Sequence, residues 1–195
     1  MADLIRVSAG GLVRSLFGER LLLAYHRKRE IYIPFGGALY ASKDSLVLLE
    51  EMGAQDFEKG NDIRFTMPRQ NLSIFEDWFR TRTGRETTSY RELYEELVEE
   101  QSVLDDFPES AISQEVLFKS CIEETHHPDR PGAKGLPTRR YLEVFEVQFA
   151  DNYSKRIEDA SHLQLPAVYL ARPEEIENQL SAKGTPISDH SLHLL

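Results

Sequence analysis

The stretch that decides the fold is Ser89–Tyr90–Arg91–Glu92–Leu93–Tyr94–Glu95–Glu96–Leu97–Val98–Glu99–Glu100. Its apolar residues recur at every third and fourth position, which predicts an amphipathic helix whose buried face consists of Tyr90, Leu93, Tyr94, Leu97 and Val98. Ser89 followed by Glu92 fits a capping box, in which each side chain bonds the backbone N–H of the other residue. The stretch therefore predicts one regular helix over residues 89–100.

The opposite face of this helix is acidic, because it carries Glu92, Glu95, Glu96 and Glu99 within a narrow arc. Like charges three and four residues apart repel by about a few tenths of a kcal/mol per pair, and no lysine is interleaved to relieve this. A divalent cation such as Mg²⁺, which prefers carboxylate oxygens, waters and phosphates, would compensate. The alternative is an ordinary solvated face, and the helix alone leaves both interpretations open.

Composition sets the wider limits. The chain has 195 residues, of which 41% are hydrophobic and 29% charged, so we expect a globular protein with a single domain over 1–195. A net charge of −10 argues against stable nucleic-acid binding, although it does not exclude nucleotides. The lone Cys121 excludes an intrachain disulfide and favours a reducing compartment. No signal peptide or membrane-length apolar run is visible, so we expect a cytoplasmic protein without membrane contact.

Hydrophobic periodicity predicts a chain in which strands and helices intermix. We expect an α/β (α+β mixed) fold, with a mixed β-sheet packed between helices. The paired Gly10–Gly11 suggests a bulge or bend in the first strand. Strands are predicted at 4–15, 20–26, 30–34, 62–67, 115–124, 140–149 and 167–170, and helices at 43–52, 71–82, 89–100, 153–162, 173–180 and from 189 onward.

The segment from Arg91 to Glu96 resembles the core of the Nudix box, Arg-Glu-aliphatic-any-Glu-Glu. The segment 84–87 resembles the Gly-Glu-Thr step before the box helix, and 33–37 resembles the Pro-Gly-Gly that ends the preceding strand. The segment 168–176 is similar to a late Nudix strand and helix start. The resemblance to the Nudix hydrolase superfamily, and to its SMODS-associated subfamily from bacterial antiviral systems, runs from about residue 4 to the end. It implies a Nudix-like α/β/α sandwich.

The sequence departs from the usual box in its spacing. An insertion of 46 residues, at about 38–83, separates Gly37 from Gly84. Glu86 sits three positions closer to Arg91 than the family pattern asks, which puts its role in doubt. Val98–Glu99 replaces the usual Gly-aliphatic pair, so we expect the helix to run on.

The resemblance implies a Mg²⁺-dependent (or Mn²⁺-dependent) hydrolase that cleaves a diphosphate linked to a nucleoside. Glu92, Glu95 and Glu96 would hold the metal, with Glu86 as a further candidate ligand. Arg91 would pair with a helix glutamate and fix its rotamer. The preferred reaction converts a nucleoside triphosphate to monophosphate and pyrophosphate. Cleavage of ADP-ribose or a dinucleotide, a catalytically silent nucleotide sensor and a pure interaction protein are the alternatives.

Residues that would contact substrate are less clearly indicated. Gly36 and Gly37 would let the backbone approach closely, Arg27 and Arg139 could bind phosphate, and Tyr141 could stack on a base. The alternatives are solvated strand ends for the arginines and a core position for the tyrosine. The general base is sought among Glu123, Glu124, Glu143 and Glu146, unless these are surface carboxylates. A nucleotide is the expected partner, and a homodimer is left open.

Overall fold

A computed structural model describes residues 3–126, 135–163 and 167–195. The chain divides into two compact units, each assembled from three segments. Unit 1 comprises Met1–Gly11, Gly37–Thr87 and Ser120–Glu143, and unit 2 comprises Leu12–Gly36, Thr88–Lys119 and Val144–Leu195. The predicted insertion at 38–83 falls in unit 1, and the helix that carries the acidic residues falls in unit 2.

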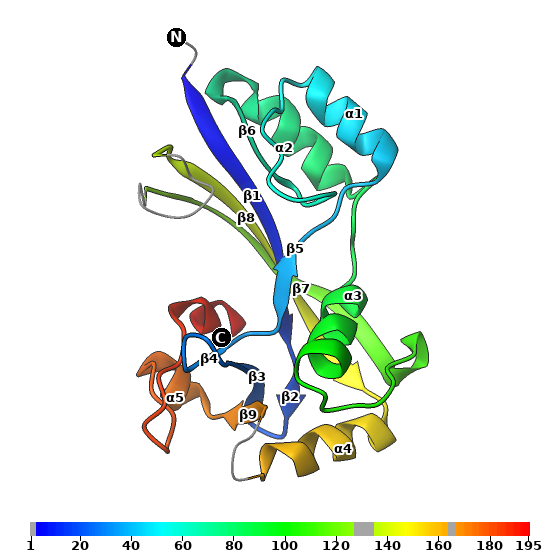
Figure 1. The fold of residues 1–195 in the computed structure, drawn as a ribbon, viewed down its shortest axis with the longest axis vertical. Helices are drawn as coiled ribbons and strands as arrows, with labels where there is room; N and C mark the ends of the chain where they lie inside the picture. The colour runs from blue at the N-terminus through cyan, green and yellow to red at the C-terminus, as the bar shows by residue number, and fades with distance from the viewer. Residues whose placement is uncertain (1–2, 127–134, 164–166) are drawn as a thin grey trace. The chain divides into compact units, whose positions relative to one another are not determined.

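Long strands contribute residues to both units (Figure 1). The five-stranded sheet has the order β5–β1–β8–β7, with β6 also pairing with β1. Its strands are β1 (Leu4–Arg14), β5 (Gly36–Ala38), β6 (Arg64–Pro68), β7 (Ile112–Thr125) and β8 (Thr138–Phe149). Strand β1 runs without a break through Gly10–Gly11, where a bulge or bend was expected. A Cβ at Gly10 would lie 3.2 Å from the Gly37 carbonyl oxygen, so the close approach of two backbones explains the glycine.

Unit 1 has an aromatic core under its helices. Helices α1 (Lys43–Glu51) and α2 (Leu72–Thr81) occupy the inserted segment, preceded by the 3-10 turn η1 (Arg69–Asn71). Phe75 of α2 meets Phe65 of β6 at 5.6 Å and Tyr141 of β8 at 5.0 Å between ring centroids. Helix α2 therefore packs on the sheet through its aromatic residues, with Phe75 and Phe79 buried and Trp78 only 8% exposed.

Unit 2 contains a smaller sheet of four strands. They are β2 (Leu16–Phe17), β3 (Arg20–His26), β4 (Ile31–Ile33) and β9 (Val168–Ala171). Strand β3 pairs antiparallel with the other three, while Tyr32 and Ile187 form a parallel bridge. Its further elements are α3 (Tyr90–Tyr94), η2 (Glu95–Glu100), η3 (Glu109–Ala111), α4 (Asp151–Ser161), α5 (Pro173–Glu177) and η4 (Asp189–Leu194).

Helices cover both faces of this sheet. Leu21 and Leu23 join a cluster with Ile176 of α5 and Leu194 of η4. The intervening Leu22 faces the other way and is 1% exposed, so that face is buried too. Figure 1 shows α3 and α4 beside the sheet away from α5. This arrangement confirms the predicted mixed α/β fold. Within the described residues, no helix is long and apolar enough to cross a membrane.

Candidate active site

The acidic helix begins differently from its prediction. The capping box is wrong, because the Ser89 hydroxyl makes no hydrogen bond to the backbone of the described helix. Instead, the Ser89 backbone N–H donates to Glu115 Oε1 of β7 at 2.6 Å. A carboxylate from a neighbouring strand thus satisfies an open N–H at the helix start, so Glu92 is left for other partners.

The helix also changes its winding in the middle. Helix α3 ends at Tyr94, and the next turn, η2, is a π-helix. Because a π-helix bonds i to i+5, the regular spacing of the predicted faces is lost. Tyr94, expected on the apolar face, is 37% exposed, whereas Glu96, expected among the solvent-facing acids, is 8% exposed. Single π-helical turns inside α-helices occur frequently at functional sites.

Glu96 is therefore a buried carboxylate. Its Oε2 accepts a hydrogen bond from the Gly36 backbone N–H at 3.1 Å. Gly36 has φ +133°, a value that side-chain-bearing residues rarely adopt, so glycine is required there. Burial raises the pKa of Glu96 well above its usual range; the charges of Glu92, Glu100 and Glu95 add to this and the Gly36 bond opposes it.

Arg91 organises the other two predicted ligands. Its Nη2 lies 2.7 Å from Glu92 Oε1, and its Nη1 lies 3.1 Å from Glu95 Oε1. The arginine thus pairs with two helix glutamates, where the sequence predicted pairing with one. This pairing holds both carboxylates on the side of the helix that also presents Glu96.

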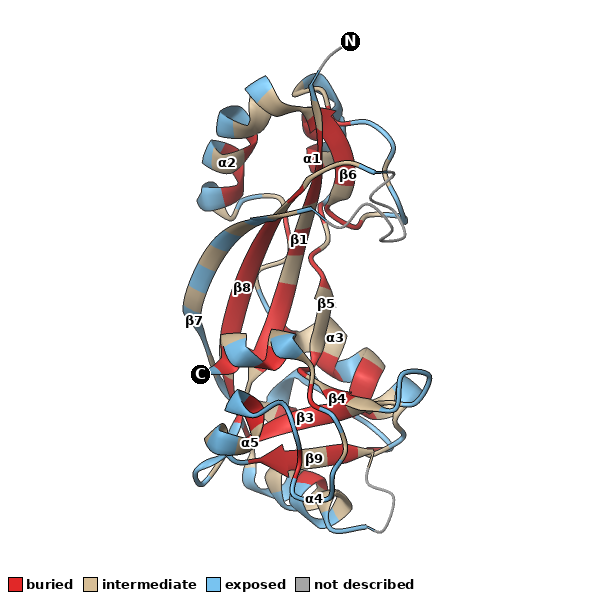
Figure 2. Ribbon diagram, turned by 90° about the vertical axis from the view of Figure 1, so that its left-hand side faces the viewer, coloured by how far each residue is buried: buried red, intermediate tan, exposed pale blue. Residues whose placement is uncertain are grey.

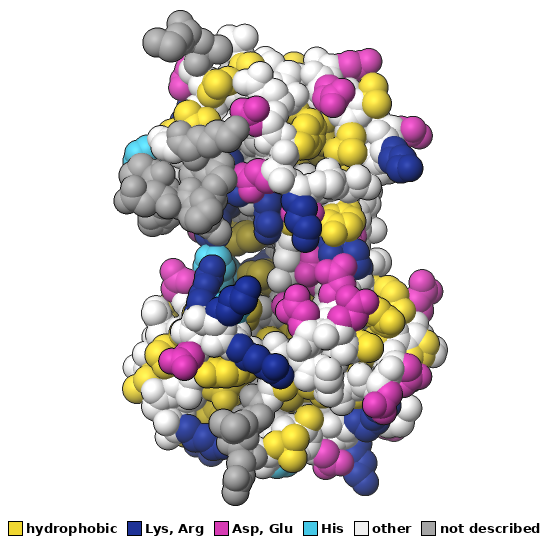
Figure 3. All heavy atoms as spheres, viewed as in Figure 1, with side chains coloured by type: hydrophobic (Ala, Val, Ile, Leu, Met, Phe, Trp, Pro, Cys, Tyr) yellow, Lys and Arg dark blue, Asp and Glu magenta, His cyan; other side chains and the backbone are white. Residues whose placement is uncertain are grey.

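A cavity of about 320 Å³ opens beside Glu96. One wall comes from the end of η2, with Glu96, Glu100 and Gln101, and the facing wall from the end of β3 and the turn after it. Gln101 ties the walls together, since its Nε2 donates to the Tyr25 carbonyl at 3.0 Å. Figure 3 shows acidic side chains over α3 and basic side chains opposite them, over the β3–β4 turn. The remaining lining residues are Ala24, Tyr25, His26, Arg27, Lys28 and Ile33.

Of the predicted substrate contacts, Arg27 lines this cavity and Gly36 touches its glutamate. Sequence reasoning missed His26, Glu100 and Gln101 as site residues, and Lys28 was considered only as a neighbour of Arg27. The run His26–Arg27–Lys28–Arg29 indicates a basic turn, but the neighbouring sequence does not show that this turn lies opposite η2 in the cavity. Glu100 was placed at the helix end without a role.

The donor set suits a divalent cation in kind. Glu96 is a buried hard-oxygen ligand whose like-charged neighbours raise its pKa, and a cation would reverse that effect. In the described residues no three Asp, Glu, His or Cys side chains close around one metal position. Glu92 and Glu95 are instead paired with Arg91.

Several predicted residues lie in unit 1 and have other partners there. Glu86 accepts from the Tyr40 backbone N–H at 3.2 Å. The Tyr141 hydroxyl donates to Glu76 at 3.0 Å, and Arg139 bonds the same carboxylate at 3.2 Å. The Tyr141 ring is 1% exposed, so the core position held open for it is the one observed. Gly37 likewise belongs to unit 1.

Each candidate general base is held by an arginine. Glu143 receives two bonds from Arg85, at 2.6 and 3.1 Å. In unit 2, Glu146 pairs with Arg14. None of the candidates lines the cavity beside Glu96. The other two pairs are Glu124 with Arg69 at 3.0 Å and Glu123 with Arg140 at 3.0 Å.

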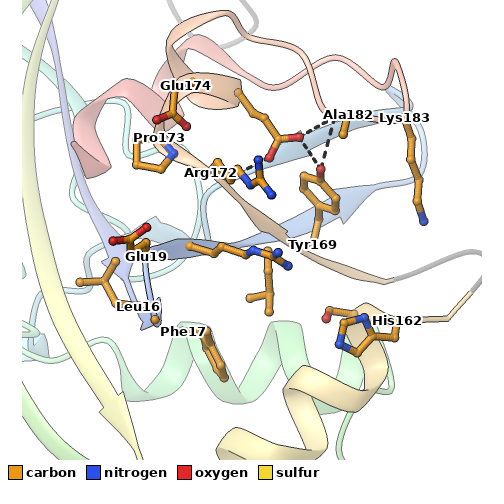
Figure 4. A pocket seen from close by; sticks show the side chains of 15 residues that line it. Leu16, Phe17, Glu19, His162, Tyr169, Arg172, Pro173, Glu174, Ala182 and Lys183 are labelled. Carbon is orange, nitrogen blue, oxygen red and sulfur yellow. Dashed lines mark hydrogen bonds between the residues drawn. The ribbon is translucent and has the colours of Figure 1, made fainter.

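A larger cavity, of about 1320 Å³, lies elsewhere in unit 2, between β3, β9 and the starts of α5 and the 182–183 turn (Figure 4). There Glu175 accepts from the Tyr169 hydroxyl and the Ala182 backbone N–H. Burial and this carboxylate raise the pKa of Tyr169 to about 12. Its lining holds equal numbers of acidic and basic side chains: Glu19, Glu174 and Glu175 with Arg20, Arg172 and Lys183. Although burial opposes it, hydrogen bonds from Arg172, Tyr169 and Ala182 lower the pKa of Glu175, whereas the pKa of Glu96 is raised.

The family described as the SMODS-associated NUDIX domain matches residues 4–195. The chain belongs to this family. The match covers both units and the interrupted box, so the insertion at 38–83 is part of the family's domain. Membership in a NUDIX family points to a nucleotide-related hydrolase ancestry, in which a divalent metal is the general cofactor. No curated protein and no solved structure matches the chain.

Proposed function

We propose that this NUDIX domain is a Mg²⁺-dependent hydrolase that converts a nucleoside triphosphate to monophosphate and pyrophosphate. One observation carries the proposal. A buried carboxylate, Glu96, is crowded by Glu92, Glu95 and Glu100 beside a cavity whose opposite wall is basic. Burying like charges together is unfavourable unless a cation joins them, and a phosphate chain with its metal supplies the remaining charge.

Glu92, Glu95 and Glu96 would hold the metal, which when bound neutralises phosphate charge and lowers the pKa of an attacking water. Arg91 orients two of these carboxylates through its bonds at 2.7 and 3.1 Å. Residues that support metal ligands in this way commonly affect metal affinity about 10-fold to 100-fold.

Arg27 and Lys28 would bind the phosphates from the facing wall. Glu100 lines the same cavity and is the carboxylate we assign to accept the proton of the attacking water. The water oxygen bonds to phosphorus as the bridging P–O bond breaks, and the pyrophosphate leaves with the electron pair. None of the four glutamates considered from sequence reaches this cavity, which is why we assign the base to η2.

Incubation of the protein with a nucleotide panel and Mg²⁺, followed by product identification, tests the proposal. Glu96→Gln should lower the rate on the order of 100-fold or more, as expected when a group that organises transition-state charge is removed. Glu99→Gln is the matched control, because Glu99 is exposed on the same turn and does not line the cavity. If the native protein hydrolyses no nucleotide faster than Glu96→Gln does, the result contradicts the proposed hydrolase activity. Release of AMP from ADP-ribose or a dinucleotide would identify the alternative substrates.

A nucleotide sensor without turnover is the second candidate. Arg91 pairs with both Glu92 and Glu95, and no three donors close around one position in the described residues. A domain fixed in this state would bind phosphates through its basic wall without hydrolysing them. Calorimetry with nucleotide, in the presence and absence of Mg²⁺, separates the two functions. A sensor binds nucleotide tightly and yields no product, and Glu96→Gln does not change its affinity for nucleotide.

The proposed setting is bacterial antiviral defence in a reducing cytoplasm. The SMODS association in the family's description supports the first part, and the single Cys121 supports the second. The net charge of −10 supports a small nucleotide, rather than a nucleic acid, as the partner.

A further inference from the structure

Strand β7 is long and lies at an edge of its sheet. It spans 14 residues, and among the described strands only β8 is its neighbour in the sheet. In Figure 2 much of β7 is coloured as exposed, in contrast to the buried β8. Edge strands offer unpaired N–H and C=O groups to any other strand, and proteins usually protect them with proline, charge or short length. The β7 sequence contains no proline and no glycine.

Three consecutive apolar residues of this edge are exposed within unit 2. Val116 is 45% exposed, and Leu117 and Phe118 are each 41% exposed. Because successive residues point to opposite faces, the exposure affects both sides of the strand at the same place. The Phe118 ring is also covered by the Arg14 guanidinium at 4.5 Å and approached by Lys119 Nζ at 5.7 Å. Apolar exposure on both faces of an edge is the pattern expected of a strand that gains a partner.

The charges beside these residues identify the partner. We propose that β7 pairs antiparallel with β7 of a second copy of this chain, with Leu117 facing Leu117 on the two-fold axis. Each residue then faces the one equally far on the other side of Leu117. Glu115 faces Lys119, and Val116 faces Phe118, each twice because of the symmetry. Opposite-charge and apolar pairs that face each other across two antiparallel strands stabilise the pairing.

Lys119 at an edge would disfavour pairing with an uncharged strand. In the proposed dimer it faces the carboxylate of Glu115 in the second copy. Glu115, Leu117 and Lys119 point to one face, and Val116 and Phe118 to the other, so both faces gain matched pairs. A shift of one residue either way would set Glu115 opposite Phe118 or Ser120 and leave the lysine without its carboxylate. Centring on Lys119 would oppose two lysines.

A register centred on Cys121 also matches one charge pair, Lys119 with Glu123. It is less favourable, because it sets the apolar Phe118 opposite Glu124. The two registers make different predictions about disulfides, since the two-fold axis brings identical residues within the Cα distance that a disulfide spans.

Light scattering coupled to size exclusion, over micromolar concentrations of the full chain, tests the proposal. The native chain should be dimeric, and Leu117→Lys should raise the dimer dissociation constant at least about tenfold. Its far-UV circular dichroism should not change, because the side chain is 41% exposed. Glu115→Lys and Lys119→Glu should each weaken the homodimer, whereas an equimolar mixture of the two variants should form a heterodimer. Rescue on mixing cannot come from a folding defect.

Oxidative cross-linking tests the register. In a Cys121→Ser background, Leu117→Cys should form an interchain disulfide and Val116→Cys should not, because position 116 faces position 118. A monomeric native chain, or a dimer unaffected by Leu117→Lys and by both charge reversals, would overturn the proposal. A disulfide between native Cys121 residues, with none at position 117, would overturn the register.

Discussion

Two buried glutamates, one in each unit, have opposite surroundings. Glu143 on β8 is 3% exposed and Glu96 on η2 is 8% exposed. Glu143 receives two bonds from Arg85, whose side chain is fully buried and whose guanidinium also donates to the Phe79 and Glu86 carbonyls. Glu96 receives a bond from the Gly36 backbone N–H and is surrounded by other carboxylates.

The comparison separates a structural carboxylate from a functional one. A buried charge is tolerated when an opposite charge and hydrogen bonds satisfy it, as Arg85 does for Glu143. Where the neighbours carry the same charge, the folded protein keeps an unfavourable site that a ligand can relieve. Burial alone therefore does not single out a candidate active site, whereas burial with like-charged neighbours beside a cavity supports the site that we propose.

The largest effect is expected from breaking the structural pair. Arg85→Ala removes the buried cation that bonds both Glu143 oxygens, leaves the more distant Arg82 Nη1 at 3.7 Å, and should lower the free energy of unfolding by about 3–5 kcal/mol. Denaturant titration measures this. Arg80→Ala is the control, because Arg80 is 62% exposed and should change stability by no more than about 0.5 kcal/mol. A loss below about 1 kcal/mol for Arg85→Ala would show that Glu143 does not depend on its partner.

Removing the charge of Glu96 should have the opposite effect, because it should raise the free energy of unfolding of the metal-free protein. Because the folded pKa is raised, the native state binds more protons than the unfolded state above the ordinary value of 4.5. Stability of the metal-free protein should therefore fall as pH rises from there through the folded pKa. Glu96→Gln should remove this slope and stabilise the metal-free protein at neutral pH by about 1–3 kcal/mol. Unfolding at a series of pH values in EDTA, with Glu99→Gln as control, measures it, and an unchanged slope would contradict the interpretation.

Removing the arginine that holds Glu92 and Glu95 should have a smaller effect than changing a carboxylate itself. Arg91→Gln should reduce kcat/KM about 10-fold, in the range found for residues that position metal ligands. Because the Arg91 side chain is only 22% exposed, denaturant unfolding of the variant is measured as well, and kinetics are compared under conditions where both variants are folded. Arg80→Gln is a matched control, because Arg80 also contacts two carboxylates on its own helix. Equal kinetics for both variants would mean that Arg91 does not position the site.

The smallest effect should come from the basic wall. Arg27→Gln should raise KM about threefold to tenfold, equivalent to about 0.6–1.4 kcal/mol, because an exposed cation is partly screened. Arg29→Gln should have no such effect, since Arg29 lies in the same turn but does not line the cavity. Steady-state kinetics of the two variants decide whether the wall, or only the net charge of the turn, binds substrate.

The sequence predicted much of the fold because periodicity reports which face of an element is buried. The helix predicted at 71–82 is found at Leu72–Thr81, and the strand predicted at 140–149 at Thr138–Phe149. The Arg91 pairing was also predictable, since both partners lie within one turn of the same helix. The like-charged arc drew attention to Glu92, Glu95 and Glu96, and, besides burial, the first two contribute to the raised pKa of the third.

The parts that failed depend on residues distant in sequence. Glu96, on the π-helical turn, accepts a hydrogen bond from the backbone N–H of Gly36, 60 residues away. The Ser89 cap was replaced by Glu115 on β7, 26 residues away. The base candidate Glu146 is held by Arg14 across 132 residues. Periodicity contains no information about such pairs, so neither the second wall of the cavity nor the role of Glu100 could be predicted.

The most direct test of the account is the effect of Mg²⁺ on the stability of the native chain and of Glu96→Gln. A ligand at 100 times its dissociation constant stabilises a protein by about 2.7 kcal/mol. We predict that saturating Mg²⁺ raises the free energy of unfolding of the native chain, and of Glu99→Gln, by an amount on this order, and that of Glu96→Gln by much less. Equal stabilisation of all three proteins, or none in the native chain, would contradict the claim that Glu96 is a cation-dependent buried carboxylate.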